Sequence, residues 1–518
     1  MGQPGAIATP HHLASAAGEK ALGAGGSAVD ATIAAAAVLA VVYPHMTGLG
    51  GDSWSLLRSS AGETLAINGT GMHPRGVDVE ALTATHGSSM PLFGAASSPV
   101  PGAVKAWGSL HAAAGRLDWS TLMADALALA KEGVEVAPSL ARDLESLWPE
   151  ISIDPGVRNI FSSARGGPKK VGETLHQPEL ALSLHALASD GPDAFYHGDL
   201  ARQLSEGMRT LGSEVSAEDF ALQESEILSP LQVIYHDHQV WTAPPNSQGF
   251  TLAQMLKILE RNDVDLDDPD YRGTLASLFG LSNTEREEYL ADPHFAEVNL
   301  EELLSNHHTQ ELFERARVGQ SESGNSQPRA SGDTVGIAAI DANGVAVSSL
   351  HSIFYSFGAR VLDPATGIVL QNRSASFSLN RHHRAYLRPG SRPPSTLLPV
   401  LIDHPDGTLS SIATMGGRSQ AQIQAQLIGR ITQGQSPEAV VAERRFVVGA
   451  FGPDLEEALV GEETVSDPVR KELGGRGFMV TDSDDFDDRC GHAQIVQINS
   501  RGFAVGSDPR ADGKRTNP

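Results

Sequence analysis

The 518-residue sequence contains a single cysteine, Cys490, so an intrachain disulfide, a CxxC motif and a cysteine-based metal cluster are all excluded. The histidines do not form a metal-binding pattern either. Adjacent histidines occur at 11–12, 307–308 and 382–383, but neighbours in sequence point in different directions, and no carboxylate stands at a metal-ligand spacing. We therefore expect no metal ion, and we interpret Cys490 and His351 as packing residues.

Basic side chains are scarce. There are 38 lysines and arginines against 63 aspartates and glutamates, which gives a formal net charge of −25. Proteins bind nucleic acid and anionic membrane surfaces through basic patches. Neither is expected as the main partner of this chain. The charge favours a soluble protein and leaves the substrate open.

Long apolar runs are also absent. The longest, residues 31–43, is interrupted by Thr32. It is shorter than the roughly 20 residues that cross a bilayer, so we expect a buried helix there. The first residues lack a basic region followed by an apolar core, and the sequence therefore predicts no export signal and a cytoplasmic location.

Apolar residues make up 40% of the chain, enough for a substantial core. Ser27 is expected to cap an alanine-rich helix that ends before Pro44. Helical patterns dominate from about 104 to 310, and short strands follow from 334 to 371. This order predicts a layered α/β protein with its sheets inside. The other expected elements are helices at 10–23, 285–290, 300–317 and 419–432, and strands at 52–57, 63–68, 409–414, 477–481, 493–499 and 502–505.

The most informative junction is Asp333-Thr334. A polar stretch, residues 319–333, ends there, and two strand-like runs follow at 334–341 and 344–351. A cut before Thr334 would leave a threonine that carries both a hydroxyl nucleophile and a free amine. That α-amine has an ordinary pKa of about 7.7–8.0, which suits a general base near neutral pH.

A glycine pair and a hydroxyl-rich loop would complete such a site. Gly416-Gly417 lies between a predicted strand and a predicted helix, where backbone amides are accessible to an oxyanion. Ser395-Thr396 would form one wall of a pocket. Each feature also has a purely structural interpretation: Thr334 as a strand residue, the glycines as a turn and the hydroxyl pair as an ordinary loop.

Several short motifs follow one another along the chain in the order in which a known family has them. From Thr334 to Phe377 the match to that family has no gaps. The earlier motifs are GGSAVDA at 25–31, HMTGLGG at 45–51, VPGAVKAW at 100–107, PPNSQG at 244–249 and EYLADPHF at 288–295. Together they resemble the γ-glutamyltransferase family of N-terminal nucleophile hydrolases, from about residue 5 to about 506. The resemblance is closest in character to the oxamate amidohydrolase and cephalosporin acylase members.

This resemblance implies a four-layer αββα sandwich that forms one domain. It also implies a proenzyme that cuts itself between Asp333 and Thr334 into a large chain, 1–333, and a small chain, 334–518. Residues 319–333 would be a flexible linker before the cut. The two chains would remain together, and a dimer of such heterodimers is compatible with the resemblance. No cofactor is implied, because the chain supplies both nucleophile and base.

The resemblance also assigns roles to the remaining catalytic positions. Gly416 and Gly417 correspond to the oxyanion glycines of the family. Ser352 lies where the family has a second threonine that orients the nucleophile. Ser395 and Thr396 match a Ser-Ser pair that contacts the substrate.

The positions that would hold a γ-glutamyl group depart from the family pattern. Thr70 replaces the arginine that meets the α-carboxylate, Phe354 replaces an Asn or Glu, and Arg373 and Ser376 replace a Gln and an Asp. Because an unpaired buried ammonium is costly, a free γ-glutamyl amine should bind poorly. Arg373 would instead bind a carboxylate on the acyl group, or it would form a structural salt bridge.

Three hypotheses follow. The first is a self-processing threonine amidohydrolase that acts on a small amide with a carboxylate-bearing acyl part, through an acyl-enzyme on Thr334. The second is a genuine γ-glutamyltransferase or glutathione hydrolase that binds glutamate through Arg360, Arg381 or Arg384. The third is an unprocessed, inactive homologue that serves as a binding protein.

Overall fold

The computed structural model describes residues 3–266, 268–319, 333–449, 458–462, 466–483 and 485–513. Residues 320–332 of the predicted linker lie outside this part of the chain.

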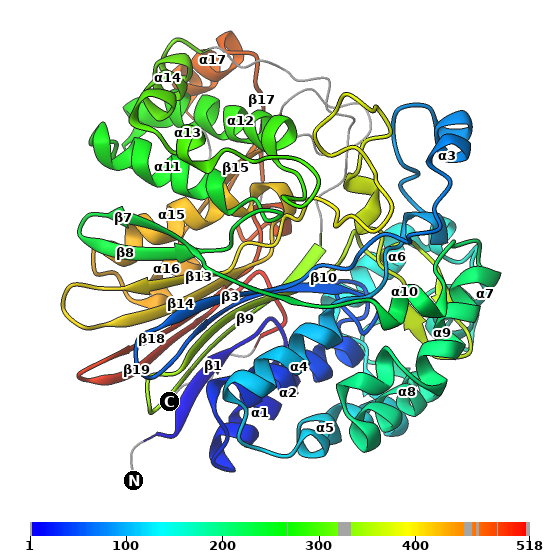
Figure 1. Ribbon diagram of the computed structural model, residues 1–518. Coiled ribbons are helices and arrows are strands. Elements are labelled where there is room, and N and C mark those ends of the chain that lie inside the picture. The colour runs from blue at the N-terminus through cyan, green and yellow to red at the C-terminus, as the bar shows by residue number, and fades with distance from the viewer. Residues whose placement is uncertain are drawn as a thin grey trace.

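Two six-stranded antiparallel sheets form the centre of the protein (Figure 1). In sheet order, the first contains β1 (Gly5–Ala8), β9 (Asp333–Asp341), β10 (Ala346–Phe354), β2 (Asp52–Arg58), β3 (Thr64–Gly69) and β6 (Glu226–Leu228). The second contains β19 (Gly502–Ser507), β18 (Ala493–Asn499), β14 (Leu409–Thr414), β13 (Val400–Asp403), β8 (His238–Thr242) and β7 (Leu231–Tyr235).

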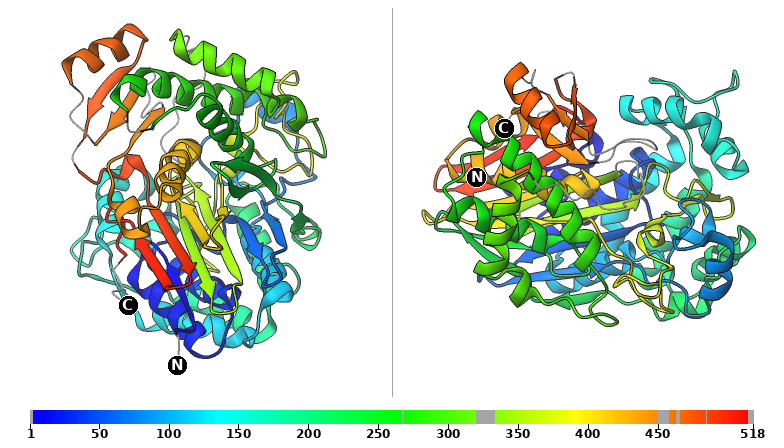
Figure 2. Two further views of the ribbon diagram at one scale, coloured as in Figure 1. Left: turned by 90° about the vertical axis from the view of Figure 1, so that its left-hand side faces the viewer. Right: turned by 90° about the horizontal axis from the view of Figure 1, so that it is seen from above.

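Helices cover the outer face of each sheet, so the layers run α, β, β, α and confirm the predicted architecture (Figures 1 and 2). Against the first sheet lie α1 (His12–Gly23), α2 (Ala28–Val42) and α4 (Ala103–Ala114), while α5 (Trp119–Glu132) packs outside α2 and α8 (Pro178–Asp190) packs on α5. Against the second sheet lie α11 (Gly249–Arg261), α15 (Gln420–Thr432) and α16 (Pro437–Ala442), while α12 (Arg272–Tyr289) and α14 (Asn306–Arg317) pack outside α11.

Shorter elements surround these layers. A small sheet of β15 (Phe446–Gly449), β16 (Ala458–Gly461) and β17 (Met479–Asp482) lies beside α17 (Asp467–Gly475). The others are α3 (Val79–His86), α6 (Pro138–Ile151), α7 (Pro155–Phe161), α9 (Asp199–Thr210), α10 (Ala217–Ala221), α13 (Leu300–Leu303), β4 (Val134–Glu135), β5 (Thr174–Leu175), β11 (Leu362–Asp363) and β12 (Ile368–Val369).

Small side chains let the two sheets approach closely where β9 and β10 face β14. A Cβ on Gly336 would lie 2.7 Å from the carbonyl carbon of Ala413. The Ser348 hydroxyl donates to the Ile412 carbonyl at 2.7 Å, which links the sheets directly. This packing brings the first residues of β9 close to the end of β14, the two places where the sequence predicts the nucleophile and the glycine pair.

Helix α2 is the buried helix that the sequence predicts. The side chain of Ser27 caps its first turn, and the Asp30 carboxylate accepts from the Ser27 backbone N–H at 2.7 Å. Every residue of the helix is buried, as expected for a helix that is apolar on all sides. Within the described residues, no helix has both the length and the apolar character needed to cross a membrane.

Most expected elements are present, but the prediction that helices dominate from 104 to 310 missed the hairpin β7–β8. Its strands alternate buried and exposed residues. They are joined by His236 and Asp237, which both adopt positive φ angles of 45° and 64°. A two-residue turn of this kind matches the twist of the strands. The alternating strand residues and the turn could therefore have predicted the hairpin. Residues 300–317 form two helices instead of one run, because Ser305 caps a new helix.

Candidate active site

Ser352 connects the predicted nucleophile with the predicted cleavage site. Its hydroxyl donates to the carbonyl oxygen of Asp333 at 2.7 Å. The buried Thr334 hydroxyl donates to the same Ser352 Oγ across 3.4 Å. The backbone N–H of Phe354 also donates to this oxygen, at 2.8 Å, and fixes its orientation. One serine therefore contacts both the hydroxyl that would attack and the carbonyl that would be attacked.

The end of β10 is shaped to present Ser352. The pairing of β9 with β10 shifts register between His351 and Phe354, and Phe354 has a φ of 81°. The 45–51 turn packs behind this irregularity: a Cβ on Gly51 would lie 2.4 Å from the Ser352 carbonyl oxygen. Only glycine fits there without displacing the backbone, which explains one glycine of the HMTGLGG motif.

The Asp333 side chain lies in an acidic environment. Removal from water raises its pKa well above the ordinary value, and the nearby carboxylates of Asp143 and Asp488 raise it further. Ser356 and Arg142 act in the opposite direction. The residue that precedes the predicted cut is thus held where its charged form is disfavoured.

This pKa shift predicts how the stability of the uncut chain depends on pH. The folded chain holds the Asp333 proton at pH values where the unfolded chain has released it, so stability falls as pH rises above about 3.8. In a Thr334→Ala background, Asp333→Asn should raise the free energy of unfolding at pH 7 and have no effect near pH 3. Urea denaturation at both pH values measures this. The exposed-carboxylate control Asp193→Asn should change neither, and an equal gain at both pH values would contradict the assignment.

Gly416 and Gly417 form the link between β14 and α15. Their φ angles are 150° and 51°, values that favour glycine. The side-chain amide of Gln248 donates to the carbonyls of Gly417 at 3.0 Å and Thr396 at 2.8 Å, which ties the glycine link to the Ser395-Thr396 loop. A backbone turn before a helix N-terminus is suited to binding an oxyanion.

The glycine link is supported from behind by the segment around Gly491. The Met415 N–H donates to the His492 carbonyl at 2.8 Å. A Cβ on Gly491 would lie 2.4 Å from the Met415 carbonyl oxygen. Arg445 donates to the Gly491 carbonyl at 2.8 Å, so the position of the link depends on a buried arginine.

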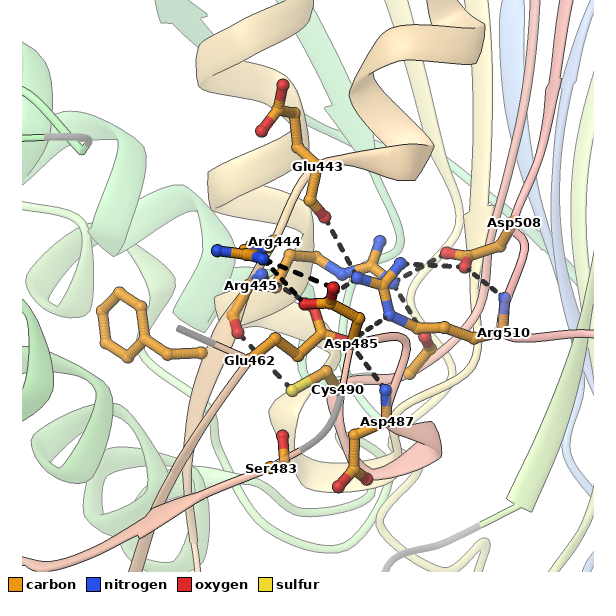
Figure 3. Close-up of polar contacts among 12 residues, drawn as sticks. Glu443, Arg444, Arg445, Glu462, Ser483, Asp485, Asp487, Cys490, Asp508 and Arg510 are labelled. Carbon is orange, nitrogen blue, oxygen red and sulfur yellow. Dashed lines mark hydrogen bonds and ion pairs between the residues drawn. The ribbon is translucent and has the colours of Figure 1, made fainter. Parts of the chain in front are cut away.

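That arginine belongs to a buried, charge-balanced network of two cations and two anions (Figure 3). Arg445 pairs with Asp508 at 2.7 Å, and Arg510 pairs with both Asp508, at 2.9 Å, and Glu462. All four side chains are fully buried. Cys490 packs beside them in the core, and burial raises its thiol pKa to about 12. His351 is likewise buried, against Trp107.

A small pocket opens beside the glycine link. Its cavity volume is about 30 Å³, room for one or two water molecules. Among its lining residues are Phe354, Ser376, Ser395 and Thr396, four of the six residues that the sequence predicts for substrate binding. The others are Arg286, Glu287, Leu290, His383, Ala385, Pro394 and Arg418.

Arg373 does not line this pocket but lies behind it. Its guanidinium is fully buried and forms two hydrogen bonds to Asp52, at 2.9 and 3.1 Å. It also donates to Thr396 Oγ1 at 3.1 Å and lies 4.4 Å from the centre of the Phe354 ring. This geometry corresponds to the structural salt bridge, the alternative to direct binding of a substrate carboxylate. Arg373 therefore positions two pocket residues, Phe354 and Thr396.

Thr70 also lies outside the pocket lining. It is fully buried, and its carbonyl accepts from Arg392 at 3.2 Å. The arginines proposed for glutamate binding are no better placed: Arg360 pairs with Glu150, Arg384 donates to the Glu297 carbonyl at 3.0 Å, and Arg381 is exposed. None of them lines the pocket.

The charged residues that do line the pocket were not predicted from the sequence. Arg418 directly follows Gly416-Gly417, and that adjacency was a usable signal. Arg286 and Glu287 come from α12, and no local pattern connects this helix with the glycine link. Glu287 accepts from Arg286 at 2.6 Å and from Arg418 at 3.1 Å.

The four layers, with Thr334 as the second residue of β9, define the fold of the N-terminal nucleophile hydrolases. The chain belongs to the gamma-glutamyltranspeptidase family, whose model matches residues 14–517. It is 35% identical to a glutathione hydrolase-like YwrD proenzyme of Bacillus subtilis, over 98% of this chain and 97% of the relative. It is 33% identical to an oxamate amidohydrolase proenzyme of Klebsiella pneumoniae, over the same shares.

A solved structure supports the same assignment. The cephalosporin acylase of Bacillus halodurans superposes with a TM-score of 0.87 at 28% identity, covering 99% of this chain and 95% of that one. The members named in these comparisons are hydrolases and acylases, and the chain is an enzyme of this type. The interpretation as an inactive binding protein is therefore disfavoured.

Proposed function

We propose that this protein is a self-processing threonine amidohydrolase that hydrolyses a small amide whose acyl part carries a carboxylate. The observation that carries the proposal is the placement of Ser352 between the Thr334 hydroxyl and the Asp333 carbonyl. The family relationship adds support, because similar chains are named as proenzymes.

Self-cleavage would begin with attack of Thr334 Oγ1 on the Asp333 carbonyl carbon. A carbon–oxygen bond forms, the Asp333–Thr334 carbon–nitrogen bond breaks, and the nitrogen takes up the proton that the hydroxyl loses. Ser352 stabilises the negative charge on the carbonyl oxygen through the hydrogen bond already present. Water then hydrolyses the ester, which leaves a carboxylate on Asp333 and restores the Thr334 hydroxyl.

Amide hydrolysis would use the same atoms again. The freed α-amine of Thr334 takes the hydroxyl proton as Thr334 Oγ1 attacks the substrate carbonyl, and it returns that proton to the leaving amine. The amides of Gly416 and Gly417 would face the oxyanion. Water releases the acyl group as an acid, so each turnover consumes one amide and one water.

Two observations support an acyl group that carries a carboxylate: the charged residues that line the pocket and the similarity to a named amidohydrolase. Two arginines and one carboxylate line the pocket. One similar enzyme is named for oxamate, an amide whose acyl part carries a carboxylate. The pocket, small in the uncut chain, favours a short acyl group.

Three chromogenic anilides test this specificity: succinyl, butyryl and γ-glutamyl. The processed enzyme should cleave the succinyl anilide with a kcat/KM at least about 10-fold above that of the butyryl anilide, because one charge-assisted contact contributes that much. The γ-glutamyl anilide should be a poor substrate with no stimulation by glycylglycine. Preferred turnover of the γ-glutamyl anilide with such stimulation would favour a genuine γ-glutamyltransferase instead.

A further inference from the structure

We infer that Arg418 is the residue that recognises the acyl carboxylate, and that Glu287 holds this arginine in place until substrate replaces it. The inference rests on the proposed amidohydrolase function and names the substrate class more closely, as monoamides of short dicarboxylic acids. Arg418 and Glu287 both line the pocket.

The position of Arg418 suits this role because it directly follows the glycine link. An acyl group whose carbonyl oxygen lies at Gly416 and Gly417 would project its chain into the pocket that Arg418 lines. The side chain of Arg418 retains 22% exposure, so a ligand in the pocket can reach it. Arg373, in contrast, is fully buried and engaged with Asp52.

Glu287 is a partner of Arg418 that a substrate carboxylate can replace. The Glu287 carboxylate accepts from Arg418 at 3.1 Å and, more closely, from Arg286 at 2.6 Å. A substrate carboxylate can take the place of Glu287 on Arg418 while Glu287 keeps its shorter contact with Arg286. Arg418 is then never left in the pocket without an anion, which limits the cost of desolvating it.

Hydroxyl groups complete the recognition surface. Ser395 and Thr396 line the same pocket and can donate to a carboxylate. Ser376 also lines it, but its hydroxyl donates to the Arg373 carbonyl at 2.7 Å. Phe354 provides the apolar wall, held by its contact with Arg373. An α-ammonium group at the charged end of the pocket would lie near two arginines and be repelled.

The test compares Arg418→Gln with the exposed control Arg381→Gln, using succinyl and butyryl anilides. Arg418→Gln should lower the succinyl-over-butyryl ratio of kcat/KM by about 10- to 100-fold, mainly through KM for the succinyl compound. Arg381→Gln should leave the ratio unchanged. Glu287→Gln, which removes the competing anion, should lower KM for the succinyl compound.

Succinate binding to the processed enzyme, measured by calorimetry, provides a readout without turnover. Arg418→Gln should weaken it by a similar factor. An unchanged ratio together with unchanged succinate binding would overturn the inference, and so would an equal loss on both anilides. A wild-type chain that stays uncut would instead refute the proposed function itself, so the two failures are distinguishable.

Discussion

Replacement of Thr334 by alanine should abolish amide hydrolysis, with a loss of at least about 10⁴-fold in kcat. The variant lacks the oxygen that would attack both the Asp333 carbonyl and the substrate. It should also remain a single chain, so that its α-amine stays locked in a peptide bond. Anilide hydrolysis under single-turnover conditions measures the loss.

Thr334→Ser is the matched control. Serine keeps the hydroxyl and loses only a methyl group, so this variant should be cut and should retain part of the activity. Activity of the alanine variant within a few-fold of wild type would show that another residue is the nucleophile.

Ser352→Ala should slow self-cleavage by about 10²- to 10³-fold, the range seen when one oxyanion donor is removed. In the uncut chain the Ser352 hydroxyl donates to the Asp333 carbonyl at 2.7 Å and accepts from Thr334. Its loss removes stabilisation from the oxygen that gains charge as Thr334 attacks. The fraction of intact chain against time, followed by mass spectrometry, measures the rate.

Ser352→Thr is the control that retains the hydroxyl, and it matches the threonine that the family resemblance places there. Its cleavage rate should stay within about 10-fold of wild type, the added methyl group accounting for the difference. Equal rates for the alanine and wild-type chains would mean that the contact with the Asp333 carbonyl has no part in processing.

Local chemistry made much of the fold predictable. Ser27 and Pro44 delimit α2, and short runs rich in small and apolar residues mark the buried strands β9 and β10. The edge hairpin β7–β8 was missed because its five-residue strands are short beside the helical patterns around them. Strand pairing across the sheets joins residues hundreds of positions apart, and only the family resemblance could supply it.

Fewer features of the candidate site than of the fold could be predicted from the sequence. The resemblance placed Thr334, Ser352 and the glycine pair at one location, and the structure brings Ser352 and Thr334 into contact. The partner of Arg373 could not be foreseen, because Asp52 lies 321 residues away. Arg418 and Glu287 meet only because α12 packs beside the glycine link. Charges that neutralise one another across such separations leave no local sequence pattern.

The central claim is that the chain cuts itself before Thr334, and the intact mass of the freshly purified wild-type protein tests it most directly. Two components are expected, which correspond to residues 1–333 and 334–518, with threonine as the new N-terminus. A single component of 518 residues, or a cut at any other bond, would contradict it.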